Sequence, residues 1–263
     1  MNILDKIVSR KKEEVALAKQ TVSVKQLEAY PNFNLTPLIF KDFLLDEKRT
    51  GIISEFKRQS PSKGLINGTA DVVAVTKAYN AAGASALSVL TDTDFFGGKA
   101  DDLIAARAVN QIPILRKDFM IDEYQILEAK AWGADLILLI ASILTPQEIA
   151  AYGKFAQSLG LSVLLEVHNL DELERSICSN LDAIGVNNRN LGNFTVNIQT
   201  SFDLVDKIPN NFLKISESAI DNPKVIKTLK AVGYQGFLIG ENFMKTDDPG
   251  HAIRDFVGKL SFI

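Results

Sequence analysis

Beyond residue 50, short apolar runs alternate with amphipathic segments of helical spacing. Four of the amphipathic segments end at a glycine that leads directly into a β-rich run, as in "AKAWGADLILLI" and "FAQSLGLSVLLEV". Glycine readily adopts the left-handed conformation that ends many helices, so these glycines predict helix C-termini. The runs that follow are almost continuously apolar, as expected for parallel strands buried on both faces. The four glycines are Gly83, Gly133, Gly160 and Gly233.

Three further runs, "QIPILRKDF", "LDAIGVNNRN" and "NFLKISESAI", together with "GIISEF" bring the number of predicted strands to eight. Helix starts are predicted at Thr145-Pro146 and Asp221-Asn222-Pro223, where a capping side chain precedes a proline. Eight strand–helix units in roughly 210 residues predict an α/β fold, the (β/α)8 or TIM barrel. A doubly wound sheet is the main alternative, but no G-x-G-x-x-G follows the first strand. The strands are predicted to end near Ser54, Leu90, Arg116, Leu139, Leu165, Val186, Ser216 and Ile239.

No Pro-, Gly- or Ser-rich linker divides the chain, so residues 1–263 are predicted to form one domain. Residues 1–48 precede the eight units and are interpreted as an N-terminal helical extension of one or two helices. The segment "MNILDKIVSRKKEEVALAKQ" has the amphipathic spacing of a helix. We expect the extension to pack over the catalytic end of the barrel and to contribute to substrate binding.

Composition narrows the class of protein. The formal net charge of −3 and the absence of a long basic block argue against nucleic acid or an anionic membrane as a partner. No apolar run reaches the ~20 residues that span a bilayer, and the N-terminus lacks the features of a signal peptide. Cys178 is the single cysteine, which suits a reducing compartment, so a cytoplasmic location is expected. Cys178 itself is expected to pack at a helix end.

Polar residues follow the apolar runs at the predicted strand ends, where barrel active sites form. Several such ends converging on one rim favour a functional site over a set of unrelated surface charges. The only histidines, His168 and His251, are not spaced as a metal-ligand pair, and no Ser-His-Asp pattern is visible. Acid–base chemistry by lysines and carboxylates remains. The rim residues are Glu55, Lys57, Lys117, Glu166, Asn187, Arg189, Glu217, Ser218 and Gly240.

Glu55 and Lys57 raise a question of their own, because they interrupt an apolar strand. Side chains alternate along a strand, so these two point the same way. They are either an ion pair at the end of a strand or a pair that faces the mouth of the barrel. The position of their strand in the barrel favours the second interpretation.

The chain resembles the indole-3-glycerol phosphate synthase family. The resemblance is carried by "IISEFKRQSPSKG", "SVLTDTDFFGG", "ILRKDFMIDEYQI", "LLEVHN", "IGVNNRNL", "SESAI" and "FLIGENFM", in family order over nearly the whole chain. The first and third of these stretches are highly specific. The N-terminal helical extension also matches the family.

The resemblance implies a carboxy-lyase of tryptophan biosynthesis that acts on 1-(2-carboxyphenylamino)-1-deoxyribulose 5-phosphate. The ring carbon bearing the carboxylate attacks the ribulose carbonyl, CO₂ leaves, and dehydration completes the indole. By resemblance, Lys117 is the general acid and Glu166 takes part in dehydration. Lys57 meets the substrate carboxylate and helps acid catalysis, with Glu55 orienting it, and the division of roles between the two lysines stays open.

The remaining site residues also follow from the resemblance. Asn187 and Glu217 would hold hydroxyl groups and the acid–base network. The phosphate is expected after strands seven and eight, at "SESAI" and "IGEN". No metal or organic cofactor is expected, because the substrate brings its own electron-rich ring. Substrate and phosphate contacts are assigned to Ser60, Arg189, Ser218 and the backbone at Ala219, Gly240 and Glu241. Phe96, Phe119 and Leu191 either wall the aromatic ring or belong to the core.

One position departs from the family pattern. Glycine usually follows the "ES" of strand seven, and this chain has Ala219. Glycine permits a positive φ or the close approach of a phosphate, whereas alanine has a steric cost for either. A weaker grip on phosphate is one consequence; a rearranged loop or lost activity is another.

Two other functions stay open from the sequence. One is a Schiff-base aldolase using Lys117 or Lys57, although nearby Glu55 and Asp118 favour the charged form of both lysines. The other is a catalytically inactive binder of a phosphorylated ligand, or a scaffold. The chain is expected to be a monomer, with weak association with other enzymes of the pathway as a further expectation.

Overall fold

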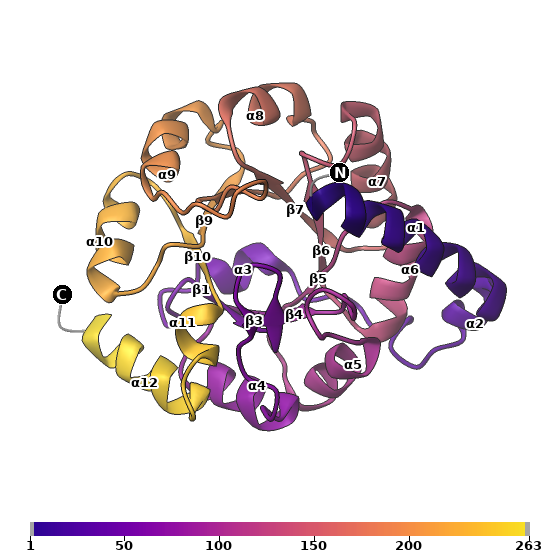
Figure 1. Cartoon of the computed structure of the whole chain (residues 1–263), viewed down its shortest axis with the longest axis horizontal. Helices are drawn as coiled ribbons and strands as arrows, with labels where there is room; N and C mark the ends of the chain where they lie inside the picture. Colours follow the sequence, from indigo (N-terminus) through magenta and orange to yellow (C-terminus); the bar gives the residue numbers. More distant parts are fainter. Residues whose placement is uncertain (1–2, 261–263) are drawn as a thin grey trace.

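The computed structural model describes residues 3–260 and contains a closed barrel of eight parallel strands, surrounded by helices (Figure 1). Strand β1 pairs with β4 on one side and with β10 on the other, which closes the barrel. The (β/α)8 prediction is therefore confirmed, and the doubly wound alternative is wrong. The strands are β1 (Ile52–Phe56), β4 (Ala86–Leu90), β5 (Ile114–Lys117), β6 (Leu136–Ile140), β7 (Ser162–Val167), β8 (Ala183–Asn187), β9 (Leu213–Glu217) and β10 (Gly236–Ile239).

Helices follow the strands along the chain and form the outer ring. The short helix α11 separates β10 from the last helix of the ring, and a 3₁₀ turn follows α9. The helices are α4 (Val72–Ala81), α5 (Ala100–Val109), α6 (Glu123–Trp132), α7 (Pro146–Ser158), α8 (Leu170–Ser176), α9 (Gln199–Leu204), α10 (Pro223–Ala231), α11 (Glu241–Met244) and α12 (Pro249–Leu260).

The helix ends lie where the sequence predicts them. Thr145 caps α7 in a capping box, its side chain accepting from the Glu148 N–H while the Glu148 carboxylate accepts from the Thr145 N–H. Asn222 caps α10, with Pro223 in its first turn. The four glycines predicted to end helices all have positive φ, for example 92° at Gly133. Local sequence chemistry thus sets the helix boundaries.

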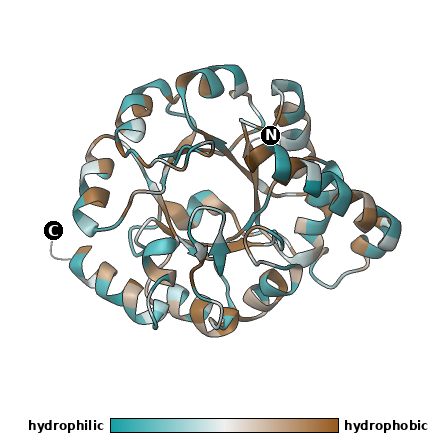
Figure 2. Cartoon of the chain, viewed as in Figure 1, coloured by the Kyte–Doolittle hydropathy of each residue, from teal (hydrophilic) through white to brown (hydrophobic). Residues whose placement is uncertain are grey.

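The barrel interior is apolar along most of its length and polar at the rim formed by the carboxyl ends of the strands. Along each strand, alternate side chains point into the lumen or toward the helices. Inward residues such as Ile53, Leu115 and Leu164 form one buried cluster inside the barrel. Two residues further along the same strands, Glu55 and Lys117 face the rim cavity. Figure 2 shows the apolar strands within a ring of helices whose surfaces are mixed.

The N-terminal extension contains three helices rather than one or two: α1 (Ile3–Thr21), α2 (Val24–Glu28) and α3 (Phe40–Leu44). Helix α1 lies over the rim, as expected, and its residues Leu4 and Ile7 line the rim cavity. Helix α3 instead closes the opposite end of the barrel, where Phe40 and Leu44 join the interior cluster. The extension therefore reaches both ends of the barrel.

A small hairpin of β2 (Gln59–Ser60) and β3 (Gly64–Leu65) follows β1 at the rim and was not predicted. It spans the stretch "QSPSKGL", whose turn residues indicate a loop. Among residues 3–260, no helix is long and apolar enough to cross a membrane.

Candidate active site

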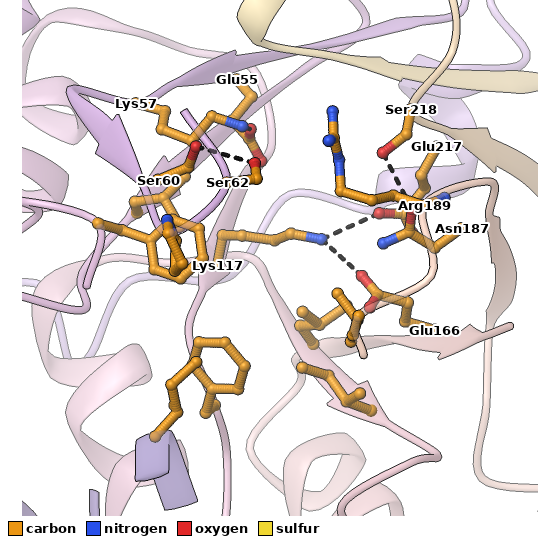
Figure 3. Close-up of a pocket in the computed structure, with 18 of the residues that line it drawn as sticks. Glu55, Lys57, Ser60, Ser62, Lys117, Glu166, Asn187, Arg189, Glu217 and Ser218 are labelled. Atoms are coloured by element: carbon orange, nitrogen blue, oxygen red, sulfur yellow. Dashed lines mark hydrogen bonds and ion pairs between the residues drawn. The ribbon is translucent and has the colours of Figure 1, made fainter. Parts of the chain in front are cut away.

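Lys117 lies at the centre of the rim cavity between two carboxylates (Figure 3). Its Nζ is 2.8 Å from Oε2 of Glu166 and 2.9 Å from Oε2 of Glu217. Lys117 and Glu217 are the last residues of β5 and β9, and Glu166 is the last but one of β7, so the parallel strands themselves bring the three together. We call Lys117, Glu166 and Glu217 the acid–base cluster.

Burial and mutual charge determine the protonation of the acid–base cluster. Burial by itself would lower the pKa of Lys117, but the carboxylates of Glu166, Glu217 and Glu55 outweigh it and raise that pKa. Burial raises the pKa of Glu217 to about 7; the negative charge of Glu166 adds to this shift, and the ammonium of Lys117 opposes it. Glu166 has the opposite shift: burial would raise its pKa, but Lys117 and His168 lower it. The cluster therefore pairs a cationic lysine and an ionised carboxylate with a carboxyl group that can carry a proton near neutral pH.

Glu55 and Lys57 form an ion pair of 2.7 Å, and both face the cavity. The two residues thus form an ion pair at the end of a strand and also face the mouth of the barrel. Gly240 is required beside it, since a Cβ atom there would lie 2.5 Å from Oε1 of Glu55. The sequence assigned Gly240 to phosphate binding, and the structure adds this role in the packing of Glu55.

Asn187 links β8 to the loop that follows β9. Its Oδ1 accepts hydrogen bonds from Oγ of Ser218 at 2.9 Å and from the backbone N–H of Arg189 at 3.0 Å. The Arg189 guanidinium reaches Glu241 across the rim at 3.2 Å. Ser60 lies on the facing hairpin and is within 3.3 Å of Ser62. These contacts give the cavity a polar side.

The opposite side of the cavity is apolar. The rings of Phe96 and Phe119 lie with their centroids 5.9 Å apart at an angle of 41°, and both line the cavity. We call these two residues the aromatic wall. Leu191 also lines the cavity, together with Ile7 from α1. The structure thus places all three apolar candidates beside the polar groups; Phe119 is also buried in the barrel interior cluster.

A second, polar compartment adjoins the first at the loops after β9 and β10. Ala219 and Gly240 line it, as do the cationic side chains of Lys63, Arg189 and Lys245. Ala219 has a φ of 59° and Ser218 a φ of 65°, in the left-handed region that favours glycine. The conformation that the usual glycine would allow is therefore present, and alanine adopts it at a cost.

The last residue of β5 and the residue that follows it have different ion-pair partners. Asp118 does not pair with Lys117; it pairs with Arg116 at 3.1 Å and with Lys11 at 3.0 Å. Lys117 is the last residue of β5 and points into the barrel, whereas Asp118 follows it and turns toward α1. Successive residues at a strand end point to opposite sides, which separates the two charges.

Two cations with little exposure, His168 and Lys11, were not predicted from the sequence. His168 lies between Glu166 at 3.3 Å and Glu172 at 3.0 Å, and Lys11 lies on the buried face of α1. His168 follows Glu166 by two positions, the spacing that places two strand side chains on one side. Lys11 falls between Ile7 and Val15 in the buried stripe of an amphipathic helix. A lysine in such a stripe signals a buried ion pair.

Within residues 3–260, no group of three or more His, Cys, Asp and Glu side chains is arranged to hold a metal ion.

A lysine–carboxylate cluster at the carboxyl ends of barrel strands defines the class: a (β/α)8-barrel enzyme equipped for acid–base chemistry. A family model described as "Indole-3-glycerol phosphate synthase" matches residues 4–256. An indole-3-glycerol phosphate synthase of Bacteroides thetaiotaomicron is 46% identical over 256 residues, covering 97% of this chain and 98% of the relative. One from Verminephrobacter eiseniae is 42% identical over 260 residues, covering 96% and 97%. The chain belongs to the indole-3-glycerol phosphate synthase family.

Solved structures of low identity agree on the fold. KGPDC from Streptococcus mutans has a TM-score of 0.61 at 12% identity, covering 81% of this chain and 97% of that one. A native KDPGal structure has a TM-score of 0.58 at 12% identity, covering 82% and 95%. At such identity the likeness concerns the barrel alone.

Proposed function

We propose that the rim cavity converts 1-(2-carboxyphenylamino)-1-deoxyribulose 5-phosphate to indole-3-glycerol phosphate, CO₂ and water. The observation that carries the proposal is the position of Lys117. Its ammonium is held between two buried carboxylates, with the aromatic wall on one side and a cationic compartment on the other. The substrate has matching parts: an aromatic carboxylate, a carbonyl at its centre and a phosphate at its end.

Ring closure places negative charge on the carbonyl oxygen as the ring carbon attacks. A buried ammonium beside that oxygen stabilises the charge and donates a proton. The bond to the carboxylate then breaks, CO₂ leaves, and the electron pair restores the aromatic ring. Lys117 is the proton donor in this step. Its raised pKa keeps the amine protonated before the reaction.

Dehydration needs an acid for the leaving hydroxide and a base that completes the indole. Glu166, ionised because Lys117 and His168 offset its burial, acts as the base. Glu217 can supply or accept a proton near neutral pH, since its pKa is about 7. Asn187 orients a substrate hydroxyl group from the same rim. The mechanism thus uses two carboxylates whose surroundings push their pKa values apart.

The two ends of the substrate bind on separate surfaces. The aromatic ring lies against Phe96, Phe119 and Leu191, and its carboxylate meets Lys57. The phosphate lies in the second compartment, where Arg189 and the Ser218 hydroxyl group are within reach. Glu241 now pairs with Arg189 and Lys63 at 3.2 and 3.5 Å. A bound phosphate would replace this carboxylate as the partner of both cations.

The aldolase alternative is less favoured by the same geometry. A lysine that forms a Schiff base attacks as a neutral amine and works best with a lowered pKa. The pKa of Lys117 is shifted the other way by its carboxylates. Borohydride treatment in the presence of a sugar phosphate is expected to leave the chain unlabelled. Labelling of Lys117 would support the aldolase function instead.

Lys117→Met is the test of the proposed chemistry. It keeps most of the side chain's packing and removes the proton donor. General acid catalysis contributes about 10²–10⁴-fold, so kcat should fall by at least roughly that factor, with a much smaller change in KM. Turnover is followed by the fluorescence of the indole product. A folded variant with more than about a tenth of the wild-type kcat would assign the acid to another residue.

Lys57→Met is the matched control for this experiment. Lys57 also lies in the cavity, but its ion pair is with Glu55 and not with the acid–base cluster. Because it faces the substrate carboxylate, its removal should raise KM as well as lower kcat. A wild-type chain without turnover would instead favour an inactive binder or scaffold.

The assembly and location of the enzyme complete the proposal. We infer a monomer, because large exposed apolar residues such as Leu17, Ile39 and Leu65 come from separate parts of the chain. We also infer a cytoplasmic location, because a single cysteine suits a reducing compartment. Weak association with other enzymes of tryptophan biosynthesis belongs to the same proposal.

A further inference from the structure

Lys11 is a buried cation that joins α1 to two loops of the catalytic rim. Its residue is 3% exposed, and its Nζ lies 2.9 Å from Oδ2 of Asp92 and 3.0 Å from Oδ1 of Asp118. Asp92 follows β4 and Asp118 follows β5, and both are buried. Glu14, one turn along α1, is a third partner at 2.7 Å.

The two aspartates also hold the backbone of the aromatic wall. Oδ1 of Asp92 accepts a hydrogen bond from the Phe96 N–H at 3.2 Å. Oδ1 of Asp118, the oxygen nearest Lys11, accepts one from the Phe119 N–H at 2.8 Å. Lys11 therefore bridges the two carboxylates that hold the backbone of the two aromatic residues.

The charge of Lys11 is compatible with this bridge. Burial alone would lower its pKa, but Asp118 and Asp92 outweigh burial and raise it, so the ammonium stays protonated. Without the ammonium, the buried carboxylate of Asp92 would face that of Asp118 across the β4 and β5 loops, and Arg116 would remain as a cation beside Asp118. Repulsion between the two carboxylates would move the loops apart, together with the aromatic wall.

Helix α1 has a second link to the same place. Ile7, one turn before Lys11, lines the cavity beside the aromatic wall. The helix thus supplies an apolar side chain to the cavity and an ammonium to the loops that form it. These contacts concern the ring end of the cavity; the phosphate compartment is lined by residues of other loops.

We propose that Lys11 is a positioning residue for the aromatic end of the substrate: it sets the spacing of Phe96 and Phe119 by bridging Asp92 and Asp118. This inference rests on the proposed function, because it takes the carboxyphenyl ring as the group that lies against the aromatic wall. It adds a residue outside the cavity to those that determine how the ring is bound.

Lys11→Met tests the inference. KM for the substrate should rise about 5- to 20-fold through lost aromatic contacts, while kcat changes less than about threefold. Direct binding separates the two ends of the ligand. The substrate with its carbonyl reduced to an alcohol cannot react, and its Kd should rise by the same factor as KM. The Kd of inorganic phosphate, a probe of the other compartment, should stay within about twofold.

Arg10→Met is the matched control, since Arg10 joins α1 to the same loop through an exposed ion pair with Asp94 of 2.7 Å. It should leave both Kd values unchanged. If Lys11→Met does not fold, the double variant Lys11→Met/Asp92→Asn removes one charge of each sign and keeps an oxygen for the Phe96 N–H. A smaller rise in the Kd of the reduced substrate is expected from it, because the bridge is lost but the two aspartates no longer repel each other.

Two results would overturn the inference. One is a wild-type Kd for the reduced substrate in a folded variant; the other is an equal loss of phosphate affinity, which would indicate a general disturbance of the rim. A wild-type chain that neither turns over the substrate nor binds its reduced form would instead refute the proposed function.

Discussion

Two consecutive residues of the phosphate compartment, Ser218 and Ala219, adopt positive φ angles of 65° and 59°. A residue with a Cβ atom in this region costs about 1–3 kcal/mol when held there by its surroundings. Glycine has no such cost, but it loses more entropy on folding. The strain therefore lies at the place where the substrate phosphate is proposed to bind.

Ala219→Gly should raise the free energy of unfolding by up to about 1 kcal/mol, because relief of strain exceeds the added entropy of glycine. Affinity for inorganic phosphate should increase or stay the same. Urea unfolding and inhibition by phosphate measure the two effects. As a control, Ala151→Gly on the exposed side of α7 should destabilise by about 1 kcal/mol. A large loss of phosphate affinity in Ala219→Gly would show that alanine is already the fitted residue.

His168 is the second residue whose surroundings have a measurable consequence. Burial would lower its pKa, but the hydrogen bonds and charges of Glu166 and Glu172 raise it to about 10. The unfolded value is about 6.5. Protonated His168 therefore stabilises the fold fully below about pH 6.5, and this contribution is lost as the pH rises through about 10.

His168→Gln should consequently be less stable than the wild type at pH 6, and the difference should shrink steadily toward pH 10. Thermal or urea unfolding at a series of pH values measures it. His251→Gln removes the other histidine, whose side chain is 65% exposed on α12, and serves as the control. A constant difference across this pH range would mean that His168 is not held protonated by its two glutamates.

At the scale of elements, the strands and the helix ends were predictable. The β5 and β7 ends lie within two residues of the predicted Arg116 and Leu165, because long apolar runs followed by charge admit few alternatives. The glycines that end helices could be predicted because their positive φ angles follow from local backbone chemistry. The hairpin β2–β3 was not predictable, since two-residue strands carry no periodicity.

Partners across the fold were harder to predict than elements. Lys117 and Glu166 could be placed at one rim, because strand ends of a barrel converge. The pairing of Asp118 with Lys11 could not be predicted, because it joins residues 107 positions apart and depends on the packing of α1 on the barrel. Ile7 and Lys11 contribute to the site from α1, and their contacts with it depend on where α1 lies on the barrel. Its position is a property of the tertiary structure.

The whole molecule separates function from stability along the barrel axis. The acid–base cluster occupies the carboxyl ends of the strands, and another buried ion pair lies at the amino ends. There Arg107 of α5 pairs with Asp135 at 2.6 Å, just before β6. Asp135 also accepts hydrogen bonds from the backbone N–H groups of Leu38 and Ile114, at 2.7 and 2.8 Å. This pair ties the extension, α5 and the strands β5 and β6 together.

Arg107→Met should lower the free energy of unfolding by about 3 kcal/mol, because it leaves the buried Asp135 carboxylate without its cation. Arg107 also donates to the backbone oxygen of Ile112 at 2.8 Å, so its loss frees a buried acceptor as well. The rim lies at the other end of the strands, and kcat and KM should remain within about twofold of wild type below the unfolding transition. Urea unfolding measures the change in stability, and steady-state kinetics on the same preparation measure kcat and KM.

Lys117→Met provides the opposite pattern, with activity lost at the rim. An Arg107→Met protein whose KM rises like that of Lys11→Met would show that the amino end of the barrel helps to shape the site, and the separation along the axis would be wrong.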